Sequence, residues 1–279
     1  MAANKQNVLI TGASSGIGFA TALYLAEKGY SVIGTSRSKA RLGGLEKQAA
    51  AKGLSVAGFE LDINENDAVS EGVSQIVSSY GQIDALVNNA GYGLWGPLQS
   101  LSMDDFKAQF ETNLFAVFRM TQAVLPGMLE RRRGAVINIS SVAGRVPTPF
   151  NSAYSASKFA LEGMSESLRM ELYPFGVRVA VVEPGLFKSR FHDGQGRDDS
   201  RLGSDSPYKE FIERYDRKHD RIMRIARDPI GVAKVVHKIL KSRNPSFRHP
   251  VGTESWLGGI GARFVPERIL EAMIRRSIM

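Results

Sequence analysis

The sequence predicts an α/β protein in which helices cover both faces of a parallel sheet, a three-layer doubly wound fold. Three observations lead to this prediction. Short runs rich in β-branched residues alternate with longer helical stretches, a glycine-rich turn follows the first run, and 43% of the residues are hydrophobic. Alternation of this kind is typical of parallel sheets, because each return to a parallel strand needs a crossover, usually a helix.

The expected strands are short, apolar and bounded by glycine or polar residues: Val8–Ile10, Tyr30–Gly34, Leu54–Phe59, Ala85–Val87, Ala135–Ile139 and Val177–Val182. The expected helices lie between them: Gly16–Lys28, Lys39–Lys52, Asn66–Tyr80, Ser102–Arg132 and Ser152–Tyr173. The fourth helix starts with a capping serine and two aspartates and ends in arginines, as the helix dipole favours.

The pattern changes after Pro184-Gly185. Residues 188–207 are polar and rich in Gly, Ser and Asp, which predicts a mobile loop. Apolar residues at helical spacing from Tyr208 to Ala226 predict an amphipathic helix, and Asp228-Pro229 predicts the start of another that reaches about Arg243. A last helix is expected between Phe264 and Met279. At roughly 150 residues per domain, and without a long linker, the chain is expected to be one domain, 1–279. Its cofactor-binding and catalytic core would be 1–186, and its substrate loop and C-terminal helices 187–279.

Composition removes several classes of protein. The 279 residues include no cysteine, which excludes a thiolate nucleophile, a Cys-ligated zinc and a disulfide. The four histidines lack metal-ligand spacing, so no metal site is expected. The N-terminus lacks the apolar segment of a cleavable signal peptide, and no apolar run reaches the ~18 residues that span a bilayer. We expect a cytoplasmic protein.

The net charge of +8 lies entirely after residue 186, since the preceding part carries equal numbers of basic and acidic residues. The favoured interpretation is that these excess charges lie on solvated helix faces. The alternative is that the C-terminal part binds an anionic partner, either a lipid-like substrate or a membrane surface. Nucleic acid is not an expected partner, because no reader motif or aromatic platform accompanies the charge.

A dinucleotide site is predicted by the turn between the first strand and the first helix. It contains Gly12, Gly16 and Gly18, which let the backbone approach a pyrophosphate at a helix N-terminus; Ser14, Ser15 and Ile17 lie between them. Ser36-Arg37 ends the second strand, where an acidic residue would select NAD(H). A hydroxyl and a guanidinium suit a 2′-phosphate, so NADP(H) is favoured over the alternative of an arginine that points to water.

Catalytic chemistry is indicated by Tyr154 and Lys158, four residues apart and on one face if the segment is helical. A nearby cation is expected to lower the pKa of the phenol towards the range useful for acid–base catalysis. Ser140 and Ser141 end the preceding strand, at the sheet edge where α/β proteins bind ligands. Ser140 and Ser141 are therefore alternative partners for Tyr154.

These motifs together resemble the short-chain dehydrogenase/reductase family, of the non-extended type. Thr11–Gly18 matches its TGxxxGxG loop, Asn88–Gly91 its NNAG segment and Pro184-Gly185 its PG turn, and Ser141 lies at the family's usual spacing before Tyr154. The resemblance covers Val8 to about Ser189 and implies a Rossmann fold. The C-terminal part is more loosely similar to 17β-hydroxysteroid and retinol dehydrogenases.

The resemblance implies a role for each matched residue. Tyr154 would exchange a proton with the substrate oxygen and Ser141 would hold that oxygen. Lys158 would bind the nicotinamide ribose, and Asn113 would anchor a water that relays protons to Lys158. Cofactor contacts are also implied for Asp62, Ile63, Asn89, Ala90, Gly91, Tyr154, Pro184, Gly185, Phe187 and Ser189.

The expected substrate is a bulky hydrophobic ketone or aldehyde. Tyr92 and Trp95 follow the NNAG segment and Phe191 lies in the tail, where the three could line a pocket; plain loop packing is the alternative. The protein would be an NADP(H)-dependent oxidoreductase, a carbonyl reductase unless cellular cofactor ratios drive it as a dehydrogenase. Other hypotheses are an anionic substrate such as an acyl phosphate or acyl-CoA, and a non-catalytic NADP(H)-binding regulator. A homodimer or homotetramer is implied, formed through Ser102–Arg132 and Ser152–Tyr173.

Overall fold

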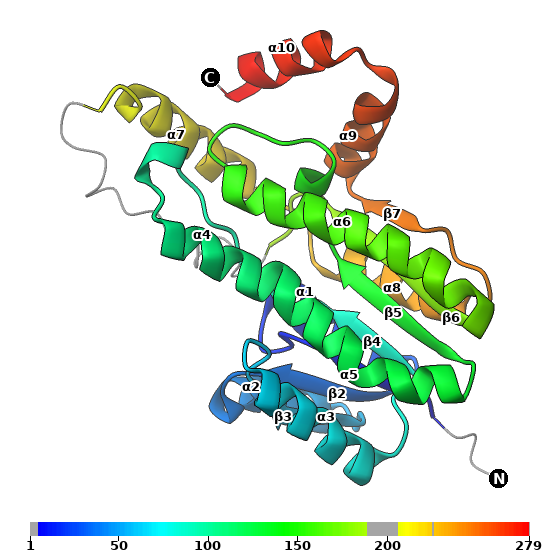
Figure 1. Cartoon of the computed structure of the whole chain (residues 1–279). Coiled ribbons are helices and arrows are strands. Elements are labelled where there is room, and N and C mark those ends of the chain that lie inside the picture. Colours follow the sequence, from blue (N-terminus) through cyan, green and yellow to red (C-terminus); the bar gives the residue numbers. More distant parts are fainter. Residues whose placement is uncertain (1–4, 189–205, 225, 279) are drawn as a thin grey trace.

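A computed structural model of the chain describes residues 5–188, 206–224 and 226–278 (Figure 1). Its centre is a seven-stranded sheet in the order β3-β2-β1-β4-β5-β6-β7, in which every neighbouring pair is parallel. The strands are β1 (Asn7–Ile10), β2 (Ser31–Ser36), β3 (Val56–Glu60), β4 (Ala85–Asn88), β5 (Gly134–Ile139), β6 (Val177–Pro184) and β7 (Arg248–Val251). The predicted doubly wound fold is confirmed.

Helices cover both faces of this sheet. They are α1 (Gly16–Glu27), α2 (Lys39–Ala51), α3 (Asn66–Tyr80), α4 (Met103–Phe110), α5 (Ala116–Glu130), α6 (Ser152–Leu172), α7 (Lys209–Arg224), α8 (Ile230–Lys241), α9 (Thr253–Phe264) and α10 (Glu267–Ile278). Short helical turns lie at η1 (Leu98–Ser100), η3 (Val142–Gly144) and η4 (Tyr173–Phe175). The last helices, α9 and α10, extend beyond the sheet at the top of Figure 1.

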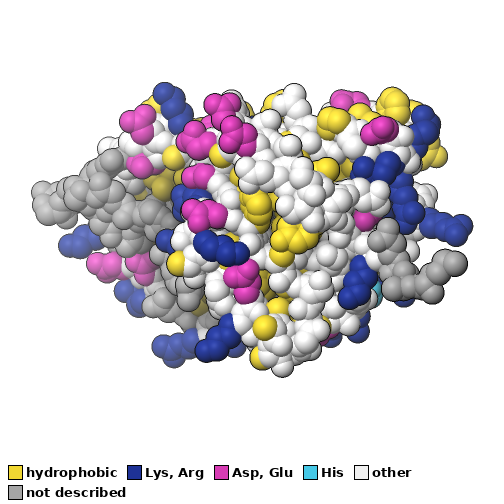
Figure 2. Space-filling model, turned by 90° about the horizontal axis from the view of Figure 1, so that it is seen from below, with side chains coloured by type: hydrophobic (Ala, Val, Ile, Leu, Met, Phe, Trp, Pro, Cys, Tyr) yellow, Lys and Arg dark blue, Asp and Glu magenta, His cyan; other side chains and the backbone are white. Residues whose placement is uncertain are grey.

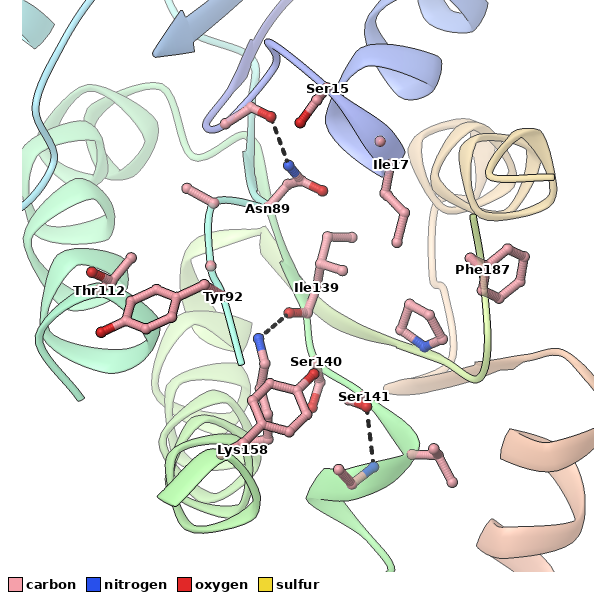
Figure 3. A pocket seen from close by; sticks show the side chains of 18 of the residues that line it. Ser15, Ile17, Asn89, Tyr92, Thr112, Ile139, Ser140, Ser141, Lys158 and Phe187 are labelled. Atoms are coloured by element: carbon pink, nitrogen blue, oxygen red, sulfur yellow. Dashed lines mark hydrogen bonds between the residues drawn. The ribbon is translucent and has the colours of Figure 1, made fainter. Parts of the chain in front are cut away.

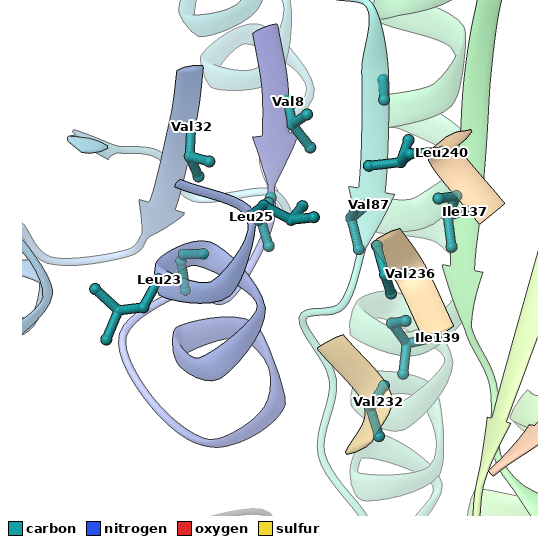
Figure 4. Packing of buried hydrophobic residues seen from close by; sticks show 14 of the residues in the cluster. Val8, Leu23, Leu25, Val32, Val87, Ile137, Ile139, Val232, Val236 and Leu240 are labelled. Atoms are coloured by element: carbon teal, nitrogen blue, oxygen red, sulfur yellow. The ribbon is translucent and has the colours of Figure 1, made fainter. Parts of the chain in front are cut away.

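Two apolar cores hold the layers together. Alternate strand residues such as Val8 and Ile10 point to the face covered by α1, α2 and α8, while Leu9 points to the face covered by α3 and α5. Figure 4 shows Val8, Val87 and Ile137 of the sheet packed beside α1 and α8. Both sheet faces are buried, which explains why the strands are continuous apolar runs rather than alternating ones.

The strand order reverses between β1 and β4. The connections from β1 lead outward to β2 and β3, whereas β4 begins the series that leads the other way. In open α/β sheets a crevice forms at the carboxyl ends of the strands at this point. Many of the residues singled out in the sequence follow the carboxyl ends of β1 to β6, so the topology brings those residues to one edge of the sheet.

The expected helix Ser102–Arg132 is interrupted. α4 begins with a capping box, in which the Ser102 hydroxyl accepts a hydrogen bond from the Asp105 amide and Asp105 accepts one from the Ser102 amide. One turn of π-helix, η2 (Glu111–Phe115), then separates α4 from α5. Asn113 lies in this turn. π-turns widen a helix locally and often occur at functional sites.

Two elements of the C-terminal part were not expected. β7 contains Arg248, His249 and Pro250 and forms the sheet edge, where a proline is tolerated because one side of the strand stays unpaired. α9 contains three glycines, which weaken a helix signal. The expected helices on either side are present as α7, α8 and α10. Most of the predicted loop 188–207 lies outside the described residues, as do Ser189 and Phe191.

The surface carries both signs of charge. On the face in Figure 2, Lys and Arg side chains and Asp and Glu side chains are both spread over the surface. Nowhere in the described ranges is a helix both long enough and apolar enough to traverse a lipid bilayer.

Candidate active site

A cavity of about 1070 Å³ opens at the carboxyl ends of the strands. The predicted residues that line it are Gly12, Ser14, Ser15, Gly16, Ile17, Ser36, Arg37, Ile63, Asn89, Ala90, Gly91, Tyr92, Ser141, Tyr154, Lys158, Pro184, Gly185 and Phe187. Figure 3 shows Ser15 and Ile17 at one end, Tyr92 and Thr112 on one side and Phe187 on the other. One cavity therefore collects residues from segments that are far apart in the sequence.

Gly18, Asp62, Asn113 and Trp95 do not line this cavity, although the sequence singled them out. A Cβ on Gly18 would overlap the side-chain nitrogen of Asn89 and the carbonyl oxygen of Gly12, so this glycine lets α1 approach the loop. Asp62 accepts a hydrogen bond from the Asn64 amide at 3.0 Å, which shapes the turn after β3. The two residues thus support the cavity wall from behind.

The turn after β1 presents free backbone donors to the cavity. Gly12 has φ +67° and Gly16 has φ +56°, conformations that favour glycine. The first turn of α1 contains no acidic residue, and no side chain caps its amides. Asn89 fixes the turn by donating to the carbonyls of Thr11 at 2.9 Å and Gly12 at 3.2 Å. A helix N-terminus with uncapped amides and its positive dipole end fits a pyrophosphate group.

Two arginines border the cavity near the end of β2. Arg37 directly follows the buried Ser36, and Arg41 lies one turn into α2; both line the cavity and both are exposed. Lys39 lies between them in sequence, but its ammonium binds Glu46 and the Gly58 carbonyl instead. Arg41 was missed because one arginine on an exposed helix gives no signal. The pair offers two guanidinium groups where NADP(H) would carry its 2′-phosphate.

Tyr154 and Lys158 extend from the first turns of α6 beside Ser141, which directly follows β5. The Tyr154 hydroxyl is hydrogen-bonded to Ser141, whose oxygen also accepts from the Ala143 amide at 3.1 Å. The Lys158 ammonium donates to the Ile139 carbonyl at 2.9 Å and lies 5.9 Å from the centre of the Tyr154 ring (Figure 3). Ser141, and not Ser140, is therefore the serine that contacts Tyr154.

Burial controls the charges of this pair. It raises the pKa of Tyr154 to about 12, against the opposite effect of the Ser141 hydrogen bond. It lowers the pKa of Lys158 to about 8, against the opposite effect of Glu162. The direction for Tyr154 is opposite to the one expected from its cationic neighbour, because loss of solvation outweighs other influences on a phenolate in this place. Tyr154 is thus protonated at neutral pH.

Asn113 holds the loop beside Tyr154 and Lys158. Its side chain accepts from the Tyr92 amide at 3.1 Å and donates to the Tyr92 carbonyl at 3.0 Å and to the Ser157 hydroxyl at 3.2 Å. Gln109 assists it, since it accepts from the Leu94 amide and donates to the Tyr92 carbonyl. Both side chains are fully buried, and Gln109 was missed because a glutamine in a helix carries no distinctive pattern.

A cluster of charged side chains lies next to Lys158. Arg248 of β7 contacts Glu162 at 3.2 Å, Glu166 at 2.9 Å and Glu183 at 3.5 Å, and Arg145 contacts Glu183 at 3.4 Å. Glu162 lies one turn after Lys158 on α6. Burial raises the pKa of Glu162 and of Glu183, while the arginines oppose that rise. The ion pairs of this cluster link the edge strand β7 to α6.

Aromatic side chains form the wall opposite the dinucleotide turn. Trp95 is buried and stacks on Tyr215 of α7 at 4.3 Å between ring centres, and Phe150 lies against both. Phe150 has φ +65°, a strained conformation for an aromatic residue. Tyr92 and Tyr215 line the cavity itself, whereas Trp95 supports Tyr215 from outside it. No cluster of metal-ligating side chains occurs within the described part of the chain.

Comparison with known proteins agrees with this geometry. The model of the short chain dehydrogenase family matches residues 6–200, and the chain therefore belongs to the short-chain dehydrogenase/reductase family of oxidoreductases. It is 38% identical to a 3-ketodihydrosphingosine reductase of Bacteroides thetaiotaomicron, over 90% of this chain and 93% of that protein.

Two further relatives bear on the C-terminal part and the cofactor. Retinol dehydrogenase 8 of Bos taurus is 36% identical over 98% of this chain and 87% of its own length. A metagenomic short-chain oxidoreductase in complex with NADP superposes with a TM-score of 0.70 at 30% identity, over 88% of this chain and 95% of that one. The predicted family is confirmed, and the similarity to a retinol dehydrogenase includes the tail.

Proposed function

We propose that this protein is an NADPH-dependent reductase of bulky, hydrophobic ketones or aldehydes. The observation that carries the proposal is the meeting of Ser141, Tyr154 and Lys158 in one cavity with an uncapped helix N-terminus. A protein that only bound a dinucleotide would have no chemical need for a buried phenol held by a serine. The relative named as a reductase of a ketosphingoid supports the same reaction class.

The phosphate and ribose ends of the cavity support NADP(H) as the cofactor. Ser14, Ser15 and the first amides of α1 would hold the pyrophosphate, and Arg37 with Arg41 would hold the 2′-phosphate through charge-assisted hydrogen bonds. Among the residues that line the cavity near these arginines there is no carboxylate to repel that phosphate. When bound, the nicotinamide would supply or accept the hydride.

The protein's own groups handle the oxygen and the proton. Ser141 donates a hydrogen bond to the substrate carbonyl oxygen, which places the carbonyl carbon for hydride addition. Tyr154, protonated at neutral pH, then gives its proton to that oxygen, so the carbonyl becomes an alcohol and Tyr154 a phenolate. The Lys158 ammonium, one helical turn away, stabilises the phenolate until a solvent proton restores the phenol. The same groups acting in reverse would oxidise an alcohol.

The substrate class follows from the wall of the cavity. Val142, Val146, Leu186, Phe187 and Tyr215 contribute apolar or aromatic surface around Tyr154. Glu254 also lines the cavity, and its carboxylate is paired with Arg227. An anionic substrate such as an acyl phosphate or acyl-CoA would need a cationic side chain to bind its charge. The described residues of this wall include no unpaired cation, so an uncharged lipid-like carbonyl compound is the favoured substrate.

The test is a turnover assay with purified protein on a panel of carbonyl compounds. The panel runs from small polar aldehydes to long-chain and polycyclic ketones, each with NADPH and with NADH. Expected is NADPH-selective reduction of the large apolar members, with little activity on the small ones. Tight NADPH binding without turnover of any member would support the non-catalytic regulator instead, and preference for acyl phosphates or acyl-CoA would contradict the apolar wall.

A further inference from the structure

α9 exposes its large apolar residues and buries its small ones. Trp256, Leu257, Ile260 and Phe264, here called the α9 face, follow one another at helical spacing and are 57%, 58%, 38% and 71% exposed. The opposite side of the helix consists of Ser255, Gly258 and Gly261. Gly258 lies against Val142 and Val146, and Gly261 against Leu270. A contiguous apolar face of this kind on a soluble surface marks an interaction site.

The next helix extends this surface. On α10 the apolar residues Ile269 and Met273 are more than half exposed, one helical turn apart. Leu270 instead packs against α9. Figure 1 shows α9 rising from the end of β7, with α10 beyond it at the top of the molecule.

The charges around the α9 face are predominantly positive. Arg263 lies beside Phe264, with its guanidinium 5.5 Å from the ring centre, and Arg268 and Arg276 follow on α10. None of these three arginines has an ion-pair partner among the described residues. The carboxylates of Glu254 and Glu271, in contrast, are occupied by Arg227 and Arg275. Glu267, at the start of α10, is a third carboxylate in this region and has no ion pair with any described residue. Among the described residues, three unpaired guanidinium groups therefore border the apolar face against one unpaired carboxylate.

We infer that the α9 face docks on an anionic lipid membrane. Tryptophan, leucine and phenylalanine on one helix face with arginines at its border are typical of helices that lie in a membrane interface. The arginines would reach the lipid headgroups while the apolar side chains enter the acyl boundary. A second copy of this chain fits less well, because a two-fold contact would place the unpaired arginines of both copies against each other.

Docking on this face would bring the candidate active site to the lipid. Glu254 and Gly258, on the inner side of the same helix, line the cavity. The outer side of α9 and the cavity rim are therefore separated by the width of one helix. A hydrophobic substrate dissolved in the membrane would meet the cavity close to where the protein binds. The docking itself does not depend on the proposed catalysis.

The experiment is sedimentation with vesicles of phosphatidylcholine alone and of phosphatidylcholine mixed with anionic phosphatidylglycerol. Expected is binding to the anionic vesicles that added salt weakens, and weaker binding to the neutral ones. The variant W256S/F264S should lose this binding. The matched control V77S/Y80S replaces exposed apolar residues on α3 and should keep it. The variant R263Q/R268Q/R276Q should lose about fivefold in partitioning per arginine on anionic vesicles only.

Two further readouts separate docking from other effects. Trp256 fluorescence of the wild-type chain should be quenched by brominated lipid, a measurement that needs no variant, because the second tryptophan, Trp95, is buried. NADPH affinity of W256S/F264S should equal that of the wild type. Equal binding to both vesicle types, no binding to either, or equal loss in both double variants would overturn the inference. So would light scattering in which W256S/F264S alone turns a dimer into a monomer, since the face would then join two copies.

Discussion

At the scale of single residues, the proposed chemistry depends on how burial shifts the pKa values of Tyr154 and Lys158. Burial keeps the phenol of Tyr154 protonated at neutral pH and lowers the pKa of the Lys158 ammonium to about 8. The meeting of Tyr154, Lys158, Ser141 and the glycine turn in one cavity could be predicted from the sequence, because these residues belong to motifs with distinctive spacing. Arg41, Gln109 and the direction of the Tyr154 pKa could not, since they follow from side-chain contacts that no spacing reveals.

Lys158 is expected to make NADPH binding depend on pH. Above pH 8 the free protein progressively loses the ammonium charge that would attract the cofactor, so affinity should fall between pH 8 and 10. Fluorescence titration with NADPH at each pH measures this. The variant Lys158→Met should bind more weakly throughout and without that pH dependence; an equal fall in both proteins would assign the effect to other groups.

The same pKa predicts the pH dependence of stability. The folded value of about 8 lies below the ordinary value of 10.5, so the unfolded chain binds more protons between these limits. The wild-type chain should therefore gain stability relative to Lys158→Met as pH rises through this window, and lose that gain as pH falls through 8. Thermal unfolding of both proteins from pH 7 to 10 checks the sign. A difference that is constant with pH would show that Lys158 is not buried as described.

Cofactor preference is expected to follow the two arginines at the end of β2. Arg37→Asp should weaken NADPH binding by roughly tenfold to hundredfold, the effect of losing a hydrogen bond to a charged group, and leave NADH nearly unchanged. Arg41→Asp should act in the same direction. Lys47→Asp makes the same charge change on the exposed face of α2, away from the cavity, and serves as the control. If all three variants weaken NADPH binding equally, the cause is long-range charge rather than contact with the phosphate.

At the scale of whole elements, the sheet and its covering helices could be predicted because apolar runs of strand length are clear signals. The break between α4 and α5 could not. Glu111–Phe115 has the residues of an ordinary helix, and its π-turn arises where Asn113 reaches Tyr92 and Ser157. β7 could not be predicted because its charged residues and proline are unusual in a buried strand. α9 could not be predicted because its glycines lower the helix propensity of the segment.

The ion pairs of Arg248 are expected to stabilise the packing of β7, and a variant can test this. Arg248→Met would leave the buried Glu162 and Glu183 with less compensating charge, at a cost on the order of 3 kcal/mol in the free energy of unfolding. Since their folded pKa values are raised, protonation relieves the variant, and its deficit should shrink as pH falls from 7 towards 5. Urea unfolding measures this, with Arg243→Met as an exposed control; a deficit that grows at low pH would contradict the arrangement.

At the scale of the whole molecule, the α9 face is one of several groups of exposed apolar side chains among the described residues. Another consists of Phe115 at the end of η2, Phe118 in the first turn of α5 and Phe159 on α6, which are 47%, 52% and 44% exposed. The family resemblance placed a contact between copies on these helices, and exposed aromatic residues are typical of such interfaces.

We expect the purified chain to be a homodimer or homotetramer joined through α5 and α6. Phe118→Arg should lower the mass measured by light scattering to a smaller assembly, while W256S/F264S should not. A wild-type chain that is monomeric at all concentrations would contradict this expectation, and a change of mass in W256S/F264S alone would assign the contact to α9 instead.

The central claim is that Tyr154 delivers the proton in an NADPH-dependent reduction, and a single-turnover measurement tests it most directly. NADPH-loaded wild-type protein and Tyr154→Phe are mixed with a bulky apolar ketone that the carbonyl panel identifies, and loss of NADPH absorbance is followed. NADPH should be oxidised roughly 10²-fold more slowly in the variant than in the wild type, while NADPH affinity stays nearly unchanged. Oxidation at the wild-type rate in Tyr154→Phe would contradict the central claim.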